Sequence, residues 1–260
     1  MPLPPSAILP ESPFIELQSV DSTNNYARQL VHADLAQNKT GVFAHEQLAG
    51  KGQRGKTWLT EKAGNIALSI IIKPQVIPLA DQFQLSACAA VAAQVFFATY
   101  AGDDTKIKWP NDLYWQDRKA GGILIESVVS SGESGISTWE WAIIGIGINI
   151  NQTHFPPHLP NPVSLKQITG KTFDPVLLAK ELHNIFLQQF DKLTTRGFSA
   201  IYEHYQANLY KKNERVRLKK DNRSFEATIR EVSKSGKLIA EHGIVEEFDF
   251  GAVEWIQLHS

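Results

Sequence analysis

Apolar runs and alternating polar residues mark most of the chain as a mixture of strands and helices. Residues 65–73 (NIALSIIIK) form an almost wholly apolar run, which predicts a central strand buried on both faces. Residues 79–100 are alanine-rich with large apolar side chains at helical spacing, which predicts one long core helix. Further strands are predicted at residues 14–20, 40–45, 106–109, 112–115, 121–129 and 139–148, with turns at 116–118 and 130–137.

Capping and helix-breaking residues locate three more helices. The run Asp21-Ser-Thr-Asn can cap a helix from Asn24 to about Ala36. Asp174-Pro175 is typical of a helix start, and this helix is expected to reach Leu193. The last helix is predicted at residues 198–209, and residues 155–162, with four prolines, are expected to form an irregular connection.

The hydrophobic period changes to two near the C-terminus. Short alternating segments at residues 215–218, 225–230, 237–240 and 245–250 are separated by turn residues, which predicts a small antiparallel β-barrel. We therefore expect an α+β fold in two domains. A mixed sheet packed with helices would occupy residues 1–210, and the barrel residues 211–260.

Composition narrows the classes of function. The 260 residues are 43% hydrophobic, enough to bury a sizeable core. A net charge of −1, from 26 basic and 27 acidic residues, argues against wholesale attraction to nucleic acid. The single cysteine, Cys88, fits a reducing compartment, and we expect no secretory leader and no apolar run long enough to span a membrane. These features predict a cytoplasmic protein with no membrane partner.

The segment from Gln47 to Trp58 is the strongest candidate for chemistry. It interleaves Gly50, Gly52 and Gly55 with Lys51, Arg54 and Lys56. Glycine lets the backbone approach a ligand closely, and the exposed amides and cations suit an anion such as phosphate. A solvated basic loop is the alternative. Three more clusters combine glycine, amide and charge beside β-forming residues, at 108–112, 118–126 and 145–150.

These clusters, in this order, resemble the motifs of biotin protein ligases, the biotin–[acetyl-CoA-carboxylase] ligases. Residues 21–26 (DSTNNY) are similar to the first biotin motif, and 47–58 to the glycine-rich basic loop. Residues 108–112 with 118–126 match the central motif, and 145–149 the fourth. The resemblance implies the class II synthetase-like biotin-lipoyl ligase catalytic domain, followed by an SH3-like barrel. The DNA-binding domain of some members has no counterpart, so no DNA partner is expected.

The resemblance also implies an activity and its site. The enzyme would join biotin to ATP as biotinyl-5′-AMP, with Mg²⁺ as the essential ion, and pass biotin to a lysine of biotin carboxyl carrier protein. Biotin contacts are implied for Ser22, Thr23, Asn24, Gln47, Lys51, Gly52, Gln53, Lys119, Gly121 and Gly122. Nucleotide contacts are implied for Arg54, Lys56, Trp58, Asn111, Asp112, Lys119 and Asn149, with Asp112 at the metal and Trp58 stacked on adenine.

Positive charge is what the reaction needs, because a carboxylate must attack a phosphate that is itself negative. By resemblance, Lys119 would bridge both anions, with Lys51 and Arg54 as the other catalytic cations. The family usually has arginine where this chain has Gln53, which puts a role of Gln53 in retaining the adenylate in doubt. Lys51 and Lys56 also replace common arginines, which keeps the charge but loses bidentate geometry.

Structural interpretations stand beside these roles. Ser22 and Thr23 can act as helix caps, the Gly121-Gly122 pair as a β-bulge, and Lys119 as a solvated lysine. Gly145 and Gly147 suit close packing as well as catalysis, and Glu126 is expected to orient a neighbour.

Other functions stay open beside biotin ligation. They are lipoate or octanoate ligation, a non-catalytic biotin or nucleotide sensor and, less favoured, a nucleic-acid-binding module. An exposed strand edge such as residues 139–148 could pair with a second copy, giving a homodimer, or with the carrier.

Overall fold

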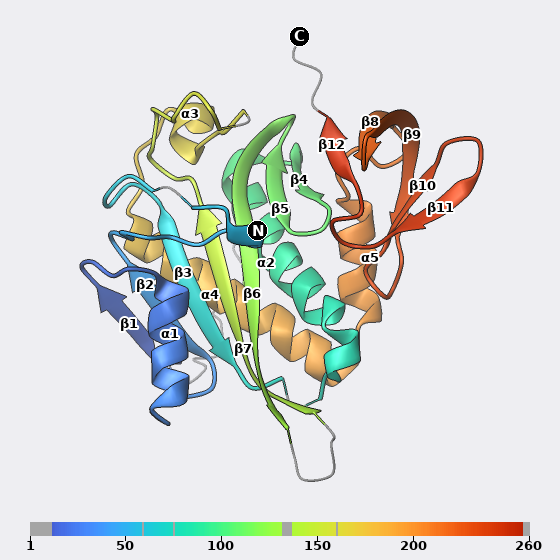
Figure 1. The fold of residues 1–260 in the computed structure, drawn as a ribbon. Helices are drawn as coiled ribbons and strands as arrows, with labels where there is room; N and C mark the ends of the chain where they lie inside the picture. The colour runs from blue at the N-terminus through green and yellow to red at the C-terminus, as the bar shows by residue number, and fades with distance from the viewer. Residues whose placement is uncertain (1–11, 59, 75, 132–136, 160, 257–260) are drawn as a thin grey trace, which may run out of the picture.

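A seven-stranded mixed sheet forms the centre of the molecule (Figure 1). The computed structural model describes residues 12–58, 60–74, 76–131, 137–159 and 161–256. The strand order is β1-β2-β3-β7-β6-β5-β4, in which β1 and β2 are parallel and the other neighbours antiparallel. The strands are β1 Phe14–Leu17, β2 Thr40–Ala44, β3 Ile66–Ile72, β4 Thr105–Lys108, β5 Asp112–Trp115, β6 Arg118–Ser131 and β7 Ser137–Ile148. The predicted mixed sheet is confirmed.

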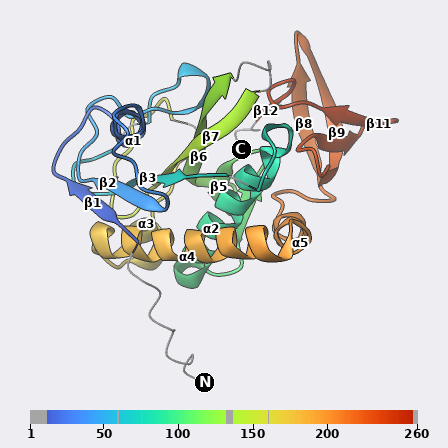
Figure 2. The same ribbon diagram turned by 90° about the horizontal axis from the view of Figure 1, so that it is seen from below.

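One face of this sheet is covered by α2 (Phe83–Ala101) and α4 (Pro175–Arg196), with α5 (Ser199–Ala207) packed beside them (Figure 2). Every residue of β3 is buried, as the apolar run predicts. Its Leu68 and Ile70, with Ile144 and Ile146 of β7, join the large core formed with these helices. Burial of such side chains contributes about 1.5–3 kcal/mol each and fixes the sheet against the helical layer.

The other face is only partly covered, and this leaves room for a site. Helix α1 (Thr23–His32) packs there on a small cluster that includes Ile71 and Ile143. Side chains alternate along a strand, so the next positions on the same face are Ser69 and Ala67 on β3 and Gly145 and Gly147 on β7. These small residues leave a hollow just beyond the N-terminus of α1.

Helix α2 is the predicted core helix. By length and hydropathy alone, Leu79–Ala101 is long enough to cross a membrane, which corrects our expectation that no segment qualifies. In the structure 67% of its most apolar window is buried against the sheet and the other helices, as in the core helix of a globular domain. Cys88 lies on this helix, fully buried, and burial raises the pKa of its thiol far above the usual range.

A second sheet of five antiparallel strands follows at the C-terminus, in the order β11-β10-β9-β8-β12. The strands are β8 Arg215–Lys220, β9 Arg223–Val232, β10 Leu238–Glu241, β11 Val245–Phe248 and β12 Glu254–Ile256. Its interior is apolar, with Leu218, Ile229 and Phe248 buried. This sheet is consistent with the predicted small barrel. It lies beyond the predicted boundary at residue 210, and the boundary itself stays a prediction.

Two details of the first helix differ from expectation. Helix α1 ends at His32 rather than near Ala36, and Asp34 follows with a φ of 58° that a helix does not allow. Ser22 occupies the N-cap position, but its side chain makes no capping hydrogen bond. The Thr23 hydroxyl bonds to Gln47 instead. The capping interpretation of these two side chains is therefore wrong, because both turn toward the hollow.

Several elements were not predicted. The short helix α3 (Leu165–Thr169) begins at a capping box formed by Ser164 and Gln167, and β12 has only three residues. The proposed exposed edge at residues 139–148 is wrong. Strand β7 lies inside the sheet between β3 and β6, so its backbone groups are already paired on both sides. The tip of the predicted 130–137 turn lies outside the described residues.

Candidate active site

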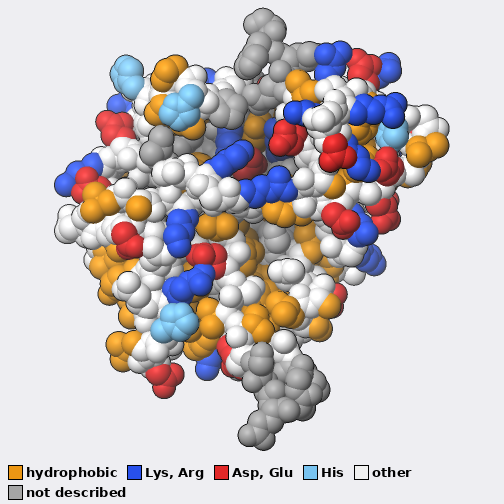
Figure 3. All heavy atoms as spheres, viewed as in Figure 1, with side chains coloured by type: hydrophobic (Ala, Val, Ile, Leu, Met, Phe, Trp, Pro, Cys, Tyr) orange, Lys and Arg blue, Asp and Glu red, His pale blue; other side chains and the backbone are white. Residues whose placement is uncertain are grey.

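The hollow on the open face is a cavity of about 330 Å³. Its walls come from distant parts of the chain: the N-terminus of α1, the loop of residues 47–58 (the basic loop), the proline-rich connection and the C-terminal sheet. Lysine and arginine side chains gather in the middle of this face (Figure 3). The cavity thus has polar and charged walls over a floor of small residues.

One end of the cavity is polar and neutral. Gln47 Oε1 accepts two hydrogen bonds from Thr23, from the backbone N–H at 2.9 Å and from the hydroxyl at 3.1 Å. Two donors on the oxygen fix the amide orientation, so the Gln47 NH₂ group faces the other way and is available as a donor. The Ser22 hydroxyl also lines this end.

Asn24 supplies an acceptor at the same end. Its Nδ2 donates to Glu126 Oε2 at 2.8 Å, and its Oδ1 accepts from the hydroxyl of Ser69 at 2.6 Å. This oxygen lies directly above Gly145, where a Cβ atom would come within 2.5 Å of it. Gly145 therefore lets the Asn24 side chain lie on the floor of the cavity, which confirms the packing interpretation of this glycine.

The other end of the cavity is charged. Lys119 Nζ donates to Asp112 Oδ1 at 2.7 Å, and about a quarter of each side chain is exposed. A β-bulge makes this pair possible. Leu113 pairs with Gly121 and Tyr114 with Lys119, so Ala120 is an extra residue in β6. The extra residue reverses the alternation of side chains and turns Lys119 to the same face as Asp112. The bulge serves the site, but it lies at Ala120 and not at the Gly121-Gly122 pair, whose pairing is regular, so the bulge interpretation of the two glycines is wrong.

Backbone contacts hold Lys119 in place. The proline-rich connection runs beside it, with Lys119 N–H donating to Asn161 O at 2.9 Å and Val163 N–H donating to Lys119 O at 2.9 Å. Asn149 donates through Nδ2 to Val163 O at 3.1 Å, and Asn111 donates to the Ile123 carbonyl. Both asparagines line the cavity and brace its walls.

The basic loop is an ordered hairpin over the cavity. Lys51 and Thr57 form an isolated β-bridge, and Trp58 N–H donates to Gly50 O at 2.8 Å. The tip is a short 3₁₀ turn, Gln53–Gly55, in which Arg54 has a φ of 54°. This loop is therefore not simply solvated chain.

Side chains of the basic loop reach three different surfaces. Lys51 Nζ donates to Asn25 Oδ1 on α1 at 2.5 Å. Gln53 Nε2 donates to the Ile123 carbonyl on the cavity wall at 3.3 Å. The Arg54 guanidinium lies 5.0 Å from the ring of Phe250 and directly over Gly251, in the turn between β11 and β12. The loop thus contacts α1, the cavity wall and the turn between β11 and β12.

Trp58 lies between the two ends of the cavity. Its indole rests on Gly147, where a Cβ atom would come within 2.4 Å of the ring. The indole N–H is buried and has no hydrogen-bond partner among the described residues. The ring forms part of the floor between Asn24 and Lys119, and its predicted stacking on adenine stays a prediction.

The segment from Phe250 to Trp255, which links β11 to β12, also contributes to the site, and the sequence did not indicate this. Phe250, Gly251, Val253 and Trp255 line the cavity. Trp255 also lies beside Lys108, the buried first residue of the 108–112 motif. Only long-range contacts bring this segment to the basic loop, so no local signal could have revealed it.

One predicted carboxylate fits a metal-binding role. Within the described residues, no group of three or more His, Cys, Asp or Glu could hold a metal by itself. Magnesium at nucleotide sites commonly uses one or two protein carboxylates, with phosphates and water as the other ligands. Asp112 fits that mode as a single carboxylate that lines the cavity, with Oδ1 bonded to Lys119 and Oδ2 as the other oxygen.

Nearly all predicted site residues meet in this cavity. They are Ser22, Thr23, Asn24, Gln47, Lys51, Gly52, Gln53, Arg54, Lys56, Trp58, Asn111, Asp112, Lys119, Gly122 and Asn149. Gly121 is not among the lining residues, because side chains alternate along β6 and its neighbour Gly122 faces the cavity. The roles assigned to the individual residues stay predictions.

Comparison with known proteins identifies the class. The model of the biotin/lipoate A/B protein ligase family matches residues 16–149, and the chain belongs to this family. A biotin–[acetyl-CoA-carboxylase] ligase of Paracoccus denitrificans is 31% identical over 229 residues, covering 86% of this chain and 92% of that protein.

Two further comparisons bear on length and fold. The bifunctional ligase/repressor BirA of Bacillus spizizenii is 34% identical over 185 residues, 70% of this chain, and the alignment spans only 55% of BirA. The biotin protein ligase of Aquifex aeolicus, solved with biotin and ATP, superposes with a TM-score of 0.78 at 22% identity. It covers 95% of this chain and all of that one, and it shares the fold, including the C-terminal sheet.

Proposed function

We propose that this protein is an ATP-dependent biotin protein ligase. It would activate biotin as biotinyl-5′-AMP and transfer the biotinyl group to a lysine of a biotin carboxyl carrier protein in the cytoplasm. Membership of the family and the similarity to the Paracoccus ligase support this proposal. The complex of the Aquifex ligase with biotin and ATP, on the same fold, also supports it.

The observation that carries the proposal is the division of the cavity into a neutral end and a cationic end. The neutral end offers the NH₂ of Gln47 as a donor and Oδ1 of Asn24 as an acceptor. A cyclic urea has one carbonyl acceptor and two N–H donors, so it can satisfy both groups. A dithiolane or a plain acyl chain would leave the Gln47 NH₂ group without a partner and the Asn24 oxygen with Ser69 alone, which is how such sites reject a ligand.

The spacing of the two ends suits a short acyl acid. Gly145 lies below Asn24, two residues along β7 from Gly147. Gly147 pairs with Gly122 of β6, and Gly122 pairs with Asp112 of β5, so Gly147 and Asp112 are two strands apart. With about 3.4 Å per residue and about 4.8 Å per strand, the Cα atoms of Gly145 and Asp112 lie roughly 12 Å apart. A ligand with its urea over Asn24 would then bring a carboxylate close to Lys119.

The residues of the cationic end would carry the first step. The carboxylate of biotin attacks the α-phosphorus of ATP, the bond to pyrophosphate breaks, and the mixed anhydride remains. Lys119 would lie between the two anions, where its ammonium reduces their repulsion and stabilises the charge of the transition state. Lys51 would close over biotin and the acyl phosphate, and Arg54 and Lys56 of the basic loop would neutralise the departing pyrophosphate. Arg54 must leave Phe250 to do so. Mg²⁺ held at Asp112 would supply further neutralisation of the phosphates.

In the second step the carrier lysine attacks the carbonyl carbon of the anhydride, and AMP leaves. Before that, the basic loop would keep water from the anhydride. Gln53, in place of the usual arginine, donates to the Ile123 carbonyl on the cavity wall, a contact compatible with a covering role.

The test is exchange of labelled pyrophosphate into ATP with biotin or lipoate as the acid. We expect exchange with biotin, little with lipoate, and its loss in Lys119→Ala with the fold intact. Near-normal exchange by this variant would refute the role of Lys119, and preference for lipoate would refute the substrate. Labelling of a purified carrier protein in the presence of Mg²⁺ and ATP tests the second step and separates a ligase from a sensor.

A further inference from the structure

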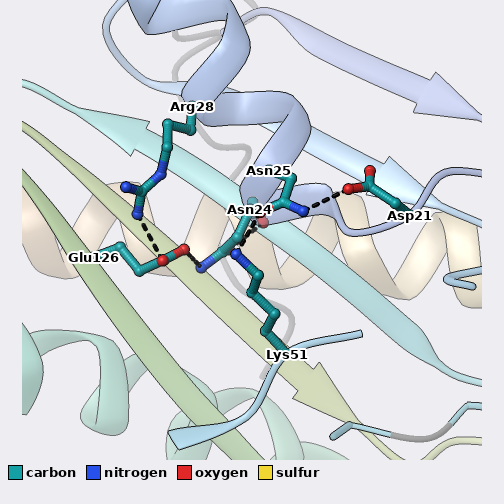
Figure 4. A network of polar contacts seen from close by, with 7 residues as sticks. Asp21, Asn24, Asn25, Arg28, Lys51 and Glu126 are labelled. Atoms are coloured by element: carbon teal, nitrogen blue, oxygen red, sulfur yellow. Dashed lines mark hydrogen bonds and ion pairs between the residues drawn. The ribbon is translucent and has the colours of Figure 1, made fainter. Parts of the chain in front are cut away.

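The carboxylate of Glu126 connects two successive turns of α1 to the sheet. Its Oε2 accepts from Asn24 Nδ2 at 2.8 Å, and its Oε1 accepts from Arg28 Nη2 at 2.6 Å (Figure 4). Asn24 and Arg28 are four residues apart, so both point to the same side of the helix. Glu126 comes from β6, on the face of the sheet that carries Gly122 and the cavity floor. The Glu126 carboxylate thus bonds both to Asn24, which lines the cavity, and to Arg28, one helical turn further along α1.

This contact fixes the orientation of the Asn24 amide. An ionised carboxylate only accepts hydrogen bonds, so Asn24 must present its NH₂ group to Glu126. Its carbonyl oxygen then lies above Gly145, within reach of the Ser69 hydroxyl. Ser69 has a single hydroxyl hydrogen, and Thr23 Oγ1 lies at 2.8 Å as a second acceptor for it. The oxygen of Asn24 therefore keeps acceptor capacity toward the cavity.

Arg28 holds the carboxylate in turn. The ion pair is partly buried, since the Glu126 side chain is 19% exposed and that of Arg28 is 37% exposed. A charged acceptor with two donors, one on each oxygen, has little freedom to rotate. The order of contacts runs from Arg28 to Glu126 to Asn24 to the cavity floor.

From this geometry we propose that Glu126, held by Arg28, is a positioning residue that sets head-group specificity. It keeps an acceptor, not a donor, at the neutral end of the cavity and so selects a ligand with an N–H group there, such as a cyclic urea. The inference rests on the proposed function and deepens it. Glu126 touches Asn24 and takes no part in the reaction at the other end.

The test separates this role from general damage. Glu126→Ala frees the Asn24 amide to turn its NH₂ group to the cavity. We expect KM for biotin to rise about tenfold, equivalent to about 1.4 kcal/mol. KM for ATP at saturating biotin and kcat should change by less than about twofold, since the cationic end is untouched. Glu140→Ala, which removes an exposed glutamate on the neighbouring strand β7, is the matched control and should leave all three unchanged.

A rescue experiment tests the orientation itself. Asn24→Asp alone would place two carboxylates against each other and weaken biotin binding. Adding Glu126→Gln restores a donor and an acceptor between the two positions and leaves an acceptor oxygen over Gly145. The double variant should therefore bind biotin better than Asn24→Asp, which structural damage would not produce.

The outcomes distinguish two failures. If wild-type protein binds no biotin, the proposed function fails and this inference fails with it. If wild-type protein binds biotin and Glu126→Ala has an unchanged KM for biotin, only the inference is overturned. The inference is also overturned if Glu126→Ala raises KM for biotin and KM for ATP together. It is overturned as well if the double variant binds biotin no better than Asn24→Asp.

Discussion

Replacing Lys108 with methionine should change how the stability of the protein depends on pH. Lys108 is buried at the joint between the two sheets. Its Nζ lies 4.6 Å from the ring of Tyr114, 5.1 Å from that of Trp255 and 5.8 Å from that of Tyr210. It also donates to the Tyr114 hydroxyl at 3.1 Å. Three aromatic rings attract the ammonium, each by about 0.5–2 kcal/mol, but they cannot replace its lost hydration.

Burial accordingly lowers the pKa of Lys108 from 10.5 to about 8, while Asp112 opposes the shift. Because the folded state releases this proton first, the unfolded chain binds more protons between about pH 8 and pH 10.5. The contribution of Lys108 to stability therefore rises with pH across this window. Linkage gives a gain of about 2 kcal/mol between about pH 7 and pH 9.5.

Urea unfolding of both proteins at the two pH values measures this gain. Lys108→Met keeps the apolar stem and removes the titrating group, so it controls for every other group that titrates. We expect the free energy of unfolding of the wild type, relative to the variant, to increase by about 2 kcal/mol on going to the higher pH. A difference that stays constant, or falls, would refute the buried-cation interpretation.

Three further predictions follow from close contacts and burial. Gly147→Ala puts a methyl group against the indole of Trp58, and the overpacking, which costs about 1–3 kcal/mol, should displace the ring and weaken biotin binding measured by calorimetry. Unchanged affinity would contradict this placement of the ring. Gly251→Ala displaces the Arg54 guanidinium, so trypsin should cut the basic loop faster than in wild type, whereas equal rates would argue against the contact. Cys88, with a raised thiol pKa and full burial, should resist alkylation until the protein unfolds, and rapid labelling of native protein would disprove its burial.

Much of the fold could be predicted because single segments carried strong patterns. The apolar run of β3 and the alanine-rich α2 need no distant information to be recognised. Helix α3 was missed although Ser164 and Gln167 form a recognisable capping box. The error about β7 has another cause. Its alternating glycines resemble a half-exposed strand, and only pairing with β3 and β6 reveals its central place.

The site was predictable as a set of motifs but not as a geometry. The resemblance of the basic loop and the 118–126 segment to known motifs pointed to residues that the fold brings into one cavity. The bulge at Ala120, which turns Lys119 to the cavity, depends on the register of β5 against β6 and has no local signature. Contacts such as Arg54 with Phe250 join residues that are far apart in the sequence, so the sequence pattern did not contain them.

The most direct measurement is a calorimetric titration of the wild-type protein with biotin, set beside one with lipoic acid. We expect one saturable site for biotin and heat no greater than dilution for lipoic acid, because only the urea satisfies Gln47 and Asn24. An absence of binding heat with biotin, or equal binding of the two acids, would contradict a cavity built for a polar head and an acid tail.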